Sequence, residues 1–149
     1  LWLRVVKGME AGRTPPTDLT VERNAGEIIH ELIADGLVNA VHDLSDGGLA
    51  VALAEMALAG GIGAEADLAG NPEYTPAQWW FGEDQGRYLV TVPDVAALNE
   101  ALSKGTRNDE TAQIGFQRIG TVGGDSMLGV PLAELRAANQ RFFAEWMEG

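Results

Sequence analysis

The chain has 149 residues, 46% of them hydrophobic, and its 22 acidic against 10 basic side chains give a net charge of −12 at pH 7. This apolar content predicts one folded domain and excludes wholesale disorder, which needs low hydrophobicity together with high charge. A strongly negative chain without a Lys/Arg cluster is repelled by nucleic-acid phosphates and by anionic lipid. We therefore expect neither nucleic acid nor membrane as a partner.

Cysteine is absent, and His30 and His42 are the only histidines. These counts exclude a disulfide framework, a thiolate nucleophile and a Cys- or His-rich metal site. The sequence shows neither a signal segment nor an apolar stretch long enough to span a bilayer. We expect a cytoplasmic protein without a metal site of its own.

The first 16 residues predict an edge segment and linker that continue from an upstream domain. Residues 1–6 are an apolar run, begun without a methionine and expected as an edge strand, and residues 8–16 carry Gly and Pro15-Pro16. The domain proper is expected over residues 17–149. It opens with a helix capped by Thr17 or Asp18 and ended by Gly36.

The middle of the chain predicts alternating strands and helices. Strands are expected over residues 37–44, 62–68 and 86–92, and a helix that is apolar on nearly every face, and hence buried on several sides, over residues 49–59. Residues 69–78 predict a loop. The aromatic triplet Trp79-Trp80-Phe81 is either buried under this loop or exposed as a contact patch. An intact strand would place Trp80 on the face opposite Trp79 and Phe81, so we expect another domain or a second copy to bury at least one of the three.

The last third predicts a helix capped by Asp94, with Val95, Leu98 and Leu102 inward and Gly105 at its end, and a loop over 106–111. Strands over 114–122 and 127–130 are expected to form a hairpin around Gly123-Gly124-Asp125. A closing helix from Pro131 has one apolar stripe, made of Leu132, Leu135, Phe142, Phe143 and Trp146. Together these elements predict an α+β domain, with a mostly antiparallel or mixed sheet covered by helices.

A first candidate ligand site lies where the strand of residues 37–44 turns into the next helix. Free amides at a helix start suit a phosphate or carboxylate, while nearby acids suit a metal ion or a ribose hydroxyl better. Ordinary helix capping and glycine turns explain most of the same residues equally well. The candidates are Asp43, Ser45, Asp46, Gly47 and Gly48.

A second candidate site directly precedes the strand of residues 86–92. It consists of Glu83, Asp84, Gln85 and Arg87, which could hold sugar hydroxyls or form a salt-bridged turn. The two adjacent carboxylates do not form an acid–base pair, because neighbouring residues of a strand point in opposite directions. We expect no catalytic residue in this chain. His42 is expected to be half-buried and hydrogen-bonded to a backbone carbonyl.

The string AVHDLSDGGLAVALAEMALAGGIGAE, residues 40–65, and the block FGEDQGR, residues 81–87, closely resemble formylglycinamidine ribonucleotide synthase, a ligase of purine biosynthesis, in its small bacterial multi-subunit form. Pro15-Pro16, the segment IGTVGG at 119–124 and a last helix match in order. The resemblance is to the C-terminal domain of the second of two units similar to aminoimidazole ribonucleotide synthetase. It implies that family's layered α+β C-terminal-domain fold.

The resemblance also implies a reaction in which formylglycinamide ribonucleotide, ATP and glutamine yield formylglycinamidine ribonucleotide. The catalytic histidine and most ATP and magnesium ligands of the family belong to N-terminal domains, so no cofactor is expected in this chain. The implied partners are the upstream domains of the same enzyme, a glutaminase subunit and a small accessory subunit. A homodimer of the chain is a further expectation.

The middle of the Glu-Ser-Gln motif in the family's first unit corresponds here to Asp84. A carboxylate in place of a hydroxyl repels an anionic ligand, so these loops are expected to shape a domain interface. Two alternatives remain. The chain could belong to another ATP-dependent enzyme of the same superfamily, such as aminoimidazole ribonucleotide synthetase or selenophosphate synthetase, or be a non-catalytic assembly module.

Overall fold

The computed structural model describes residues 1–12, 14–67, 74–104 and 114–148. Within these residues, no helix is long and apolar enough to cross a membrane. Helices and strands are mixed along the chain, in the order α1 (Trp2–Lys7), α2 (Leu19–Ala34), β1 (Ala40–Asp43), α3 (Gly48–Gly60), β2 (Ala64–Ala66), α4 (Pro76–Phe81), β3 (Tyr88–Thr91), α5 (Val95–Lys104), β4 (Gly120–Val122), β5 (Ser126–Met127), β6 (Val130–Pro131) and α6 (Leu132–Glu148).

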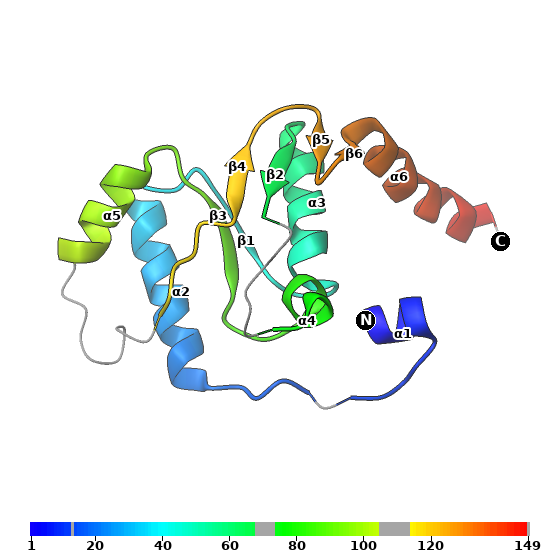
Figure 1. Ribbon diagram of the computed structural model, residues 1–149, viewed down its shortest axis with the longest axis horizontal. Coiled ribbons are helices and arrows are strands. Elements are labelled where there is room, and N and C mark those ends of the chain that lie inside the picture. Colours follow the sequence, from blue (N-terminus) through cyan, green and yellow to red (C-terminus); the bar gives the residue numbers. More distant parts are fainter. Residues whose placement is uncertain (13, 68–73, 105–113, 149) are drawn as a thin grey trace.

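The strands form two small sheets, which confirms the predicted α+β class (Figure 1). In the first sheet β1 pairs antiparallel with β3, so that Ala40 lies opposite Thr91. The second sheet has the order β4-β2-β5-β6, with antiparallel pairs at both ends and a parallel β2–β5 pair in the middle. The sheet content is therefore mixed, as expected.

The predicted hairpin around Gly123-Gly124-Asp125 is wrong, because β2 lies between the two strands it was to join. Ala64 faces Val122 on one side and Met127 on the other. The connection wraps around the start of β2, where Gly63 donates to the Gly124 carbonyl at 2.9 Å and Gly123 donates back to Gly63 at 2.8 Å. The tight turn occurs one step later, between β5 and β6.

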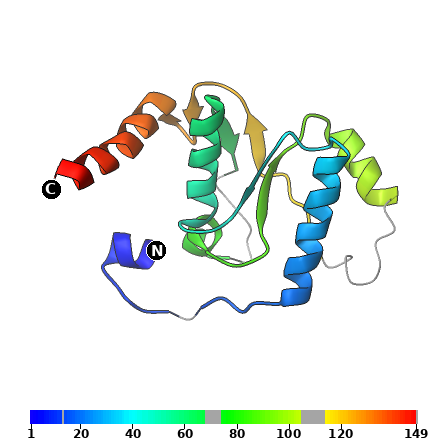
Figure 2. The same ribbon diagram turned by 180° about the vertical axis from the view of Figure 1, so that it is seen from behind.

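Helix α3 lies at the centre of the main core, as its apolar sequence predicts. It lies in front of the four-stranded sheet in Figure 2 and packs against α4, α6 and both sheets. The buried members of this core are Leu44, Leu49, Ala52, Leu53, Ala57, Trp80, Leu89 and Met127.

A second core lies between α2, α5 and the β1–β3 sheet. Its buried members are Ile28, Leu32, Val38 and Leu98. Both helices begin as predicted, since the side chains of Asp18 and Asp94 each accept two backbone N–H groups of the first turn. Val95, expected to point inward, is 45% exposed. The predicted loop over 106–111 and the helix end at Gly105 lie outside the described residues.

Residues 2–7 form helix α1, so the predicted edge strand is wrong. Trp2 is half-buried and stacks on Phe81 with ring centroids 5.7 Å apart, while Lys7 lies over the Trp2 ring. Gly8, with φ of 62°, closes the helix: its N–H donates to the Arg4 carbonyl, and the Met9 N–H donates to the Leu3 carbonyl. A positive-φ glycine directly after a short basic turn is a helix-end signal that favours this outcome.

The aromatic triplet belongs to helix α4 and not to a strand. Thr75 and Gln78 form a reciprocal capping box, with Pro76 in the first turn. Trp80 is buried, and Trp79 and Phe81 are half-buried against the main core. The predicted contact patch is therefore largely covered by this domain itself, and the homodimer expected from it loses this basis.

Helix α6 starts at Leu132, as Pro131 predicts, but its apolar stripe is buried only at the beginning. Leu132 and Leu135 pack against the main core. Further along, Phe142 is 62% and Trp146 77% exposed. The second half of α6 projects away from the rest of the domain (Figure 1).

Candidate functional site

The loop between β1 and α3 is held by two glycines with left-handed backbone, Gly47 with φ of 82° and Gly48 with φ of 65°. Gly47, and not Ser45, stands at the N-cap of α3, and Ser45 and Asp46 are both exposed. A Cβ on Gly48 would lie 2.6 Å from the Gly82 carbonyl oxygen. Close packing against the end of α4 therefore explains why position 48 is a glycine, and no ligand is needed to explain it.

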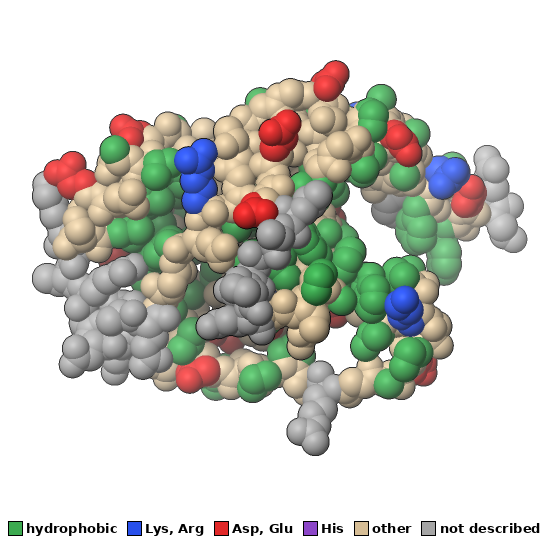
Figure 3. Space-filling model, in the orientation of Figure 1, with side chains coloured by type: hydrophobic (Ala, Val, Ile, Leu, Met, Phe, Trp, Pro, Cys, Tyr) green, Lys and Arg blue, Asp and Glu red, His purple; other side chains and the backbone are tan. Residues whose placement is uncertain are grey.

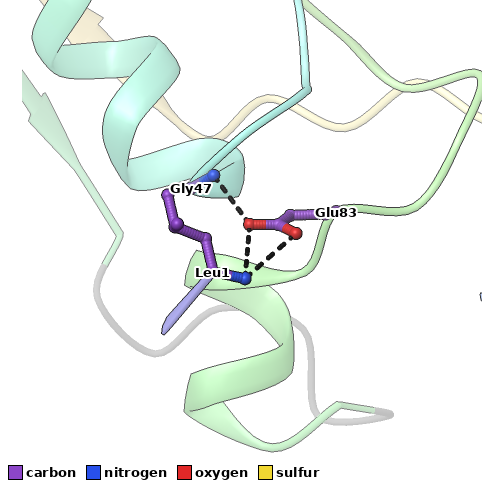
Figure 4. A network of polar contacts seen from close by, with 3 residues as sticks. All are labelled: Leu1, Gly47 and Glu83. Carbon is purple, nitrogen blue, oxygen red and sulfur yellow. Dashed lines mark hydrogen bonds and ion pairs between the residues drawn. The ribbon is translucent and has the colours of Figure 1, made fainter. Parts of the chain in front are cut away.

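Glu83 joins the two candidate motifs. Its Oε1 accepts a hydrogen bond from the Gly47 N–H at 2.9 Å, and its carboxylate also lies 3.0 Å from the Leu1 ammonium nitrogen (Figure 4). Burial opposes the charged form, but the hydrogen bond from the Gly47 N–H favours it, and the pKa of Glu83 is lowered. Glu83 is thus held as a carboxylate at the start of α3.

The rest of the second motif forms a salt-bridged turn. Arg87 Nη1 donates to Asp84 Oδ1 at 2.7 Å, and the guanidinium lies over the Trp79 ring, 5.4 Å from its centroid. The Arg87 carbonyl accepts the Leu44 N–H at 2.9 Å, which ties the turn to the end of β1. Gln85 is exposed. Of the two alternatives for this motif, the geometry favours the structural one.

The arrangement fits a phosphate poorly. An anion at a helix start needs free amides, and here the Glu83 carboxylate already binds the Gly47 amide. Asp43 is exposed at the end of β1. Across residues 1–12, 14–67, 74–104 and 114–148, no group of three His, Asp or Glu side chains is placed to hold a metal ion. The two loops therefore do not fit the phosphates of ATP or a magnesium ion.

The structure also shows contacts that the sequence did not predict. His42 is half-buried, with Nδ1 2.6 Å from the Asp43 carbonyl oxygen as expected, but its Nε2 also lies 3.2 Å from a Glu55 carboxylate oxygen on α3. His42 and Glu55 are 13 positions apart in the sequence and belong to no local motif. Only the packing of α3 against β1 brings them together.

The geometry defines an α+β domain in which the two candidate loops are bound to each other rather than left open. The family model described as "AIR synthase related protein, C-terminal domain" matches residues 1–132. The chain therefore belongs to the family of AIR synthase related C-terminal domains.

Two relatives carry the name "Phosphoribosylformylglycinamidine synthase subunit PurL". The protein from Erythrobacter litoralis is 78% identical over 99% of this chain, and the protein from Novosphingobium aromaticivorans 50% identical over 100% of it. The matched parts are 20% and 18% of those proteins, so the chain spans about a fifth of their length.

The fold is also that of a solved structure, "T. maritima PurL complexed with FGAR", from Thermotoga maritima. It aligns with a TM-score of 0.63 and 23% identity over 87% of this chain and 23% of that one. This likeness establishes the fold of the chain as that of a domain within a larger protein.

Proposed function

We propose that this chain is a C-terminal domain of a phosphoribosylformylglycinamidine synthase, which converts formylglycinamide ribonucleotide, ATP and glutamine to formylglycinamidine ribonucleotide in purine biosynthesis. The observation that carries the proposal is the 78% identity to a synthase subunit across 99% of the chain. Identity this high across the whole chain extends beyond the shared fold to the surface and loops.

Within that enzyme the domain acts as scaffold and wall and supplies no catalytic group. Glu83 occupies the Gly47 amide, and Asp84 is paired with Arg87, so the two loops are satisfied by each other. The candidate residues Asp43, Ser45, Asp46 and Gln85 are exposed and are the ones left to face a neighbouring domain or a ligand. ATP and magnesium would bind to other domains of the polypeptide.

The partners follow from the same proposal. The relatives are named as a "subunit", which supports an assembly with further subunits, for which we propose a glutaminase and a small accessory protein. The upstream domains of the same polypeptide would be the nearest partner. A purine-biosynthetic ligase of this kind would work in the cytoplasm.

The test uses a grafted synthase, in which the matching part of the Erythrobacter litoralis protein is replaced by this chain. A bacterial strain lacking its own synthase subunit should grow without purines when it carries the graft. A matched version from which the same part is deleted should not support growth. The purified graft, assayed with formylglycinamide ribonucleotide, ATP, magnesium and ammonia, should show turnover.

Failure of a well-expressed, folded graft to support growth or turnover would contradict the proposal. The Asp84→Ser change introduces the serine found in the family's first unit. It distinguishes a loop that only forms part of the scaffold from a loop that binds the substrate. If the domain is scaffold, this variant of the graft should retain the KM for formylglycinamide ribonucleotide. A lower KM would show that the loop contacts the substrate.

A further inference from the structure

Helix α6 is attached to the domain through its first turns. Leu132 and Leu135 pack against the main core, and Arg136 Nη2 donates to the Leu58 carbonyl at 3.1 Å across the end of α3. The Leu132 N–H donates to the Asp125 carbonyl at 2.9 Å. These contacts fix the direction in which the rest of the helix leaves the domain.

The second half of α6 continues the same apolar face into solvent. Trp146 is eleven residues after Leu135 and four after Phe142, spacings that place all three on one side of a helix. Phe142 is 62%, Trp146 77% and Met147 84% exposed. Hydrophobic side chains gather along the part of α6 that faces α1 (Figure 3). A surface of this kind marks an interface, since it exposes tryptophan, phenylalanine and methionine together.

We propose that the face formed by Phe142 and Trp146 docks onto an apolar surface of another domain of the same long polypeptide. This inference rests on the proposed function. The family model ends at residue 132, so α6 lies outside the part shared by the whole family. The synthase relatives nevertheless match this chain to 99% and 100% of its length, and about four-fifths of each lies outside the match. Helix α6 is thus a feature shared with the long synthase chains, whose remaining four-fifths would supply the surface that receives it.

Two physical arguments favour another domain of the same polypeptide as the partner of this face. A helix segment of about ten residues is marginal in water without tertiary packing. The Arg141–Glu145 ion pair, at 3.6 Å, and the Phe142–Trp146 stack each join neighbouring turns of this half of α6. A second copy of the chain is the poorer partner, because two molecules of net charge −12 repel each other.

Hydrogen exchange of the grafted synthase tests the docking. Amides of residues 139–148 should exchange at least tenfold more slowly than in an unstructured peptide. The double change Phe142→Ser and Trp146→Ser should abolish this protection. The matched control, Ala137→Ser with Ala144→Ser, introduces serines at exposed positions on the opposite side of the helix and should preserve it.

Rapid exchange of residues 139–148 in the unmodified graft would overturn the docking, as would equal loss of protection in both double variants. Protection that disappears on dilution, together with a dimer mass by light scattering, would identify a second copy as the occupant and also overturn it. Growth without purines is scored separately. A growing strain whose graft has an unprotected α6 refutes the docking alone, and a protected graft without activity refutes the proposed function.

Discussion

Gly48 shows how a single backbone position fixes the contact between α3 and α4. Its φ of 65° disfavours any L side chain, and a Cβ would lie 2.6 Å from the Gly82 carbonyl oxygen. We expect Gly48→Ala to lower the free energy of unfolding by about 2–4 kcal/mol, the sum of backbone strain and overpacking. Urea unfolding of the chain measures this loss.

Gly36 provides the matched control. Its φ of 67° is nearly the same, but within the part of the chain that the structure describes a Cβ there meets no atom within 4 Å. Gly36→Ala should therefore cost only the backbone strain, about 1–2 kcal/mol. Equal losses in the two variants would show that Gly48 is retained for its conformation alone and that α4 does not press against it.

Glu83 should contribute stability that depends on pH. Its pKa is lowered in the folded chain, so the folded state favours the carboxylate and gains stability above the ordinary pKa of about 4.5. This gain is lost as the pH falls through the lowered pKa. At pH 7, Glu83→Gln should cost about 1 kcal/mol, the contribution of a hydrogen bond to a charged group less that of the amide that replaces it.

The difference between the Glu83→Gln variant and the parent chain should shrink as urea unfolding is repeated at pH values below 4.5. Glu31→Gln, a change of the same kind at an exposed position of α2, is the control and should leave the unfolding curves unchanged at every pH. A Glu83→Gln loss that stays constant with pH would mean that the carboxylate charge is not what Gly47 binds.

At the scale of single residues, the sequence predicted which residues belong to the two candidate loops but not the contacts between the loops. Asp18 and Asp94 were identifiable as caps, because a cap acts on amides two or three residues away. The Glu83–Gly47 bond joins residues 36 positions apart and has no local pattern. The same holds for the contact between His42 and Glu55, since both follow from how α3 packs.

At the scale of elements, the order of the second sheet can be tested with paired cysteines, because the chain contains no cysteine of its own. Glu65 and Thr121 are partners across β2 and β4. Partner Cα atoms in adjacent strands lie within the range that a disulfide spans. Glu65→Cys with Thr121→Cys should therefore form a disulfide on mild oxidation. The peptides that carry residues 65 and 121 would then stay joined in a digest run without reducing agent.

The competing pair is Val122→Cys with Ser126→Cys, which a hairpin around residues 123–125 would place opposite each other. In the observed order β2 separates these strands, so they lie about 10 Å apart, twice the spacing of neighbouring strands. This pair should stay reduced under the same conditions. Rapid cross-linking of it, with none at residues 65 and 121, would restore the hairpin.

Local signals in the sequence explain which elements could be predicted. The long helices α2 and α3 and the strands β1 and β3 carry clear periodicity or β-branched runs, and they were found. In α4 the capping residues Thr75 and Gln78 prevail over the β-propensity of the aromatic triplet. The order of β2, β4 and β5 could not be predicted, because strands of two or three residues carry almost no register information.

At the scale of the whole molecule, the excess of acidic side chains destabilises the folded chain through self-repulsion. The net charge of −12 is spread over 149 residues, and the ion pairs Arg23–Glu27 and Arg141–Glu145 are exposed and contribute little. Raising the ionic strength from 0.01 to 0.1 M shortens the screening length from about 30 to about 10 Å. Screening should therefore weaken the repulsion more than it weakens these short-range pairs.

We thus expect the thermal midpoint of the chain to rise by a few degrees over this range, since a change of about 1 kcal/mol shifts the midpoint of a domain this size by roughly 2–8 °C. Sodium, potassium and choline chlorides at equal ionic strength should have the same effect, because screening depends on charge and not on the identity of the cation. A fall in the midpoint would mean that ion pairs outweigh the repulsion. A rise with sodium or potassium but not with choline would instead reveal a bound cation, and would reopen Asp43 and Asp46 as its ligands.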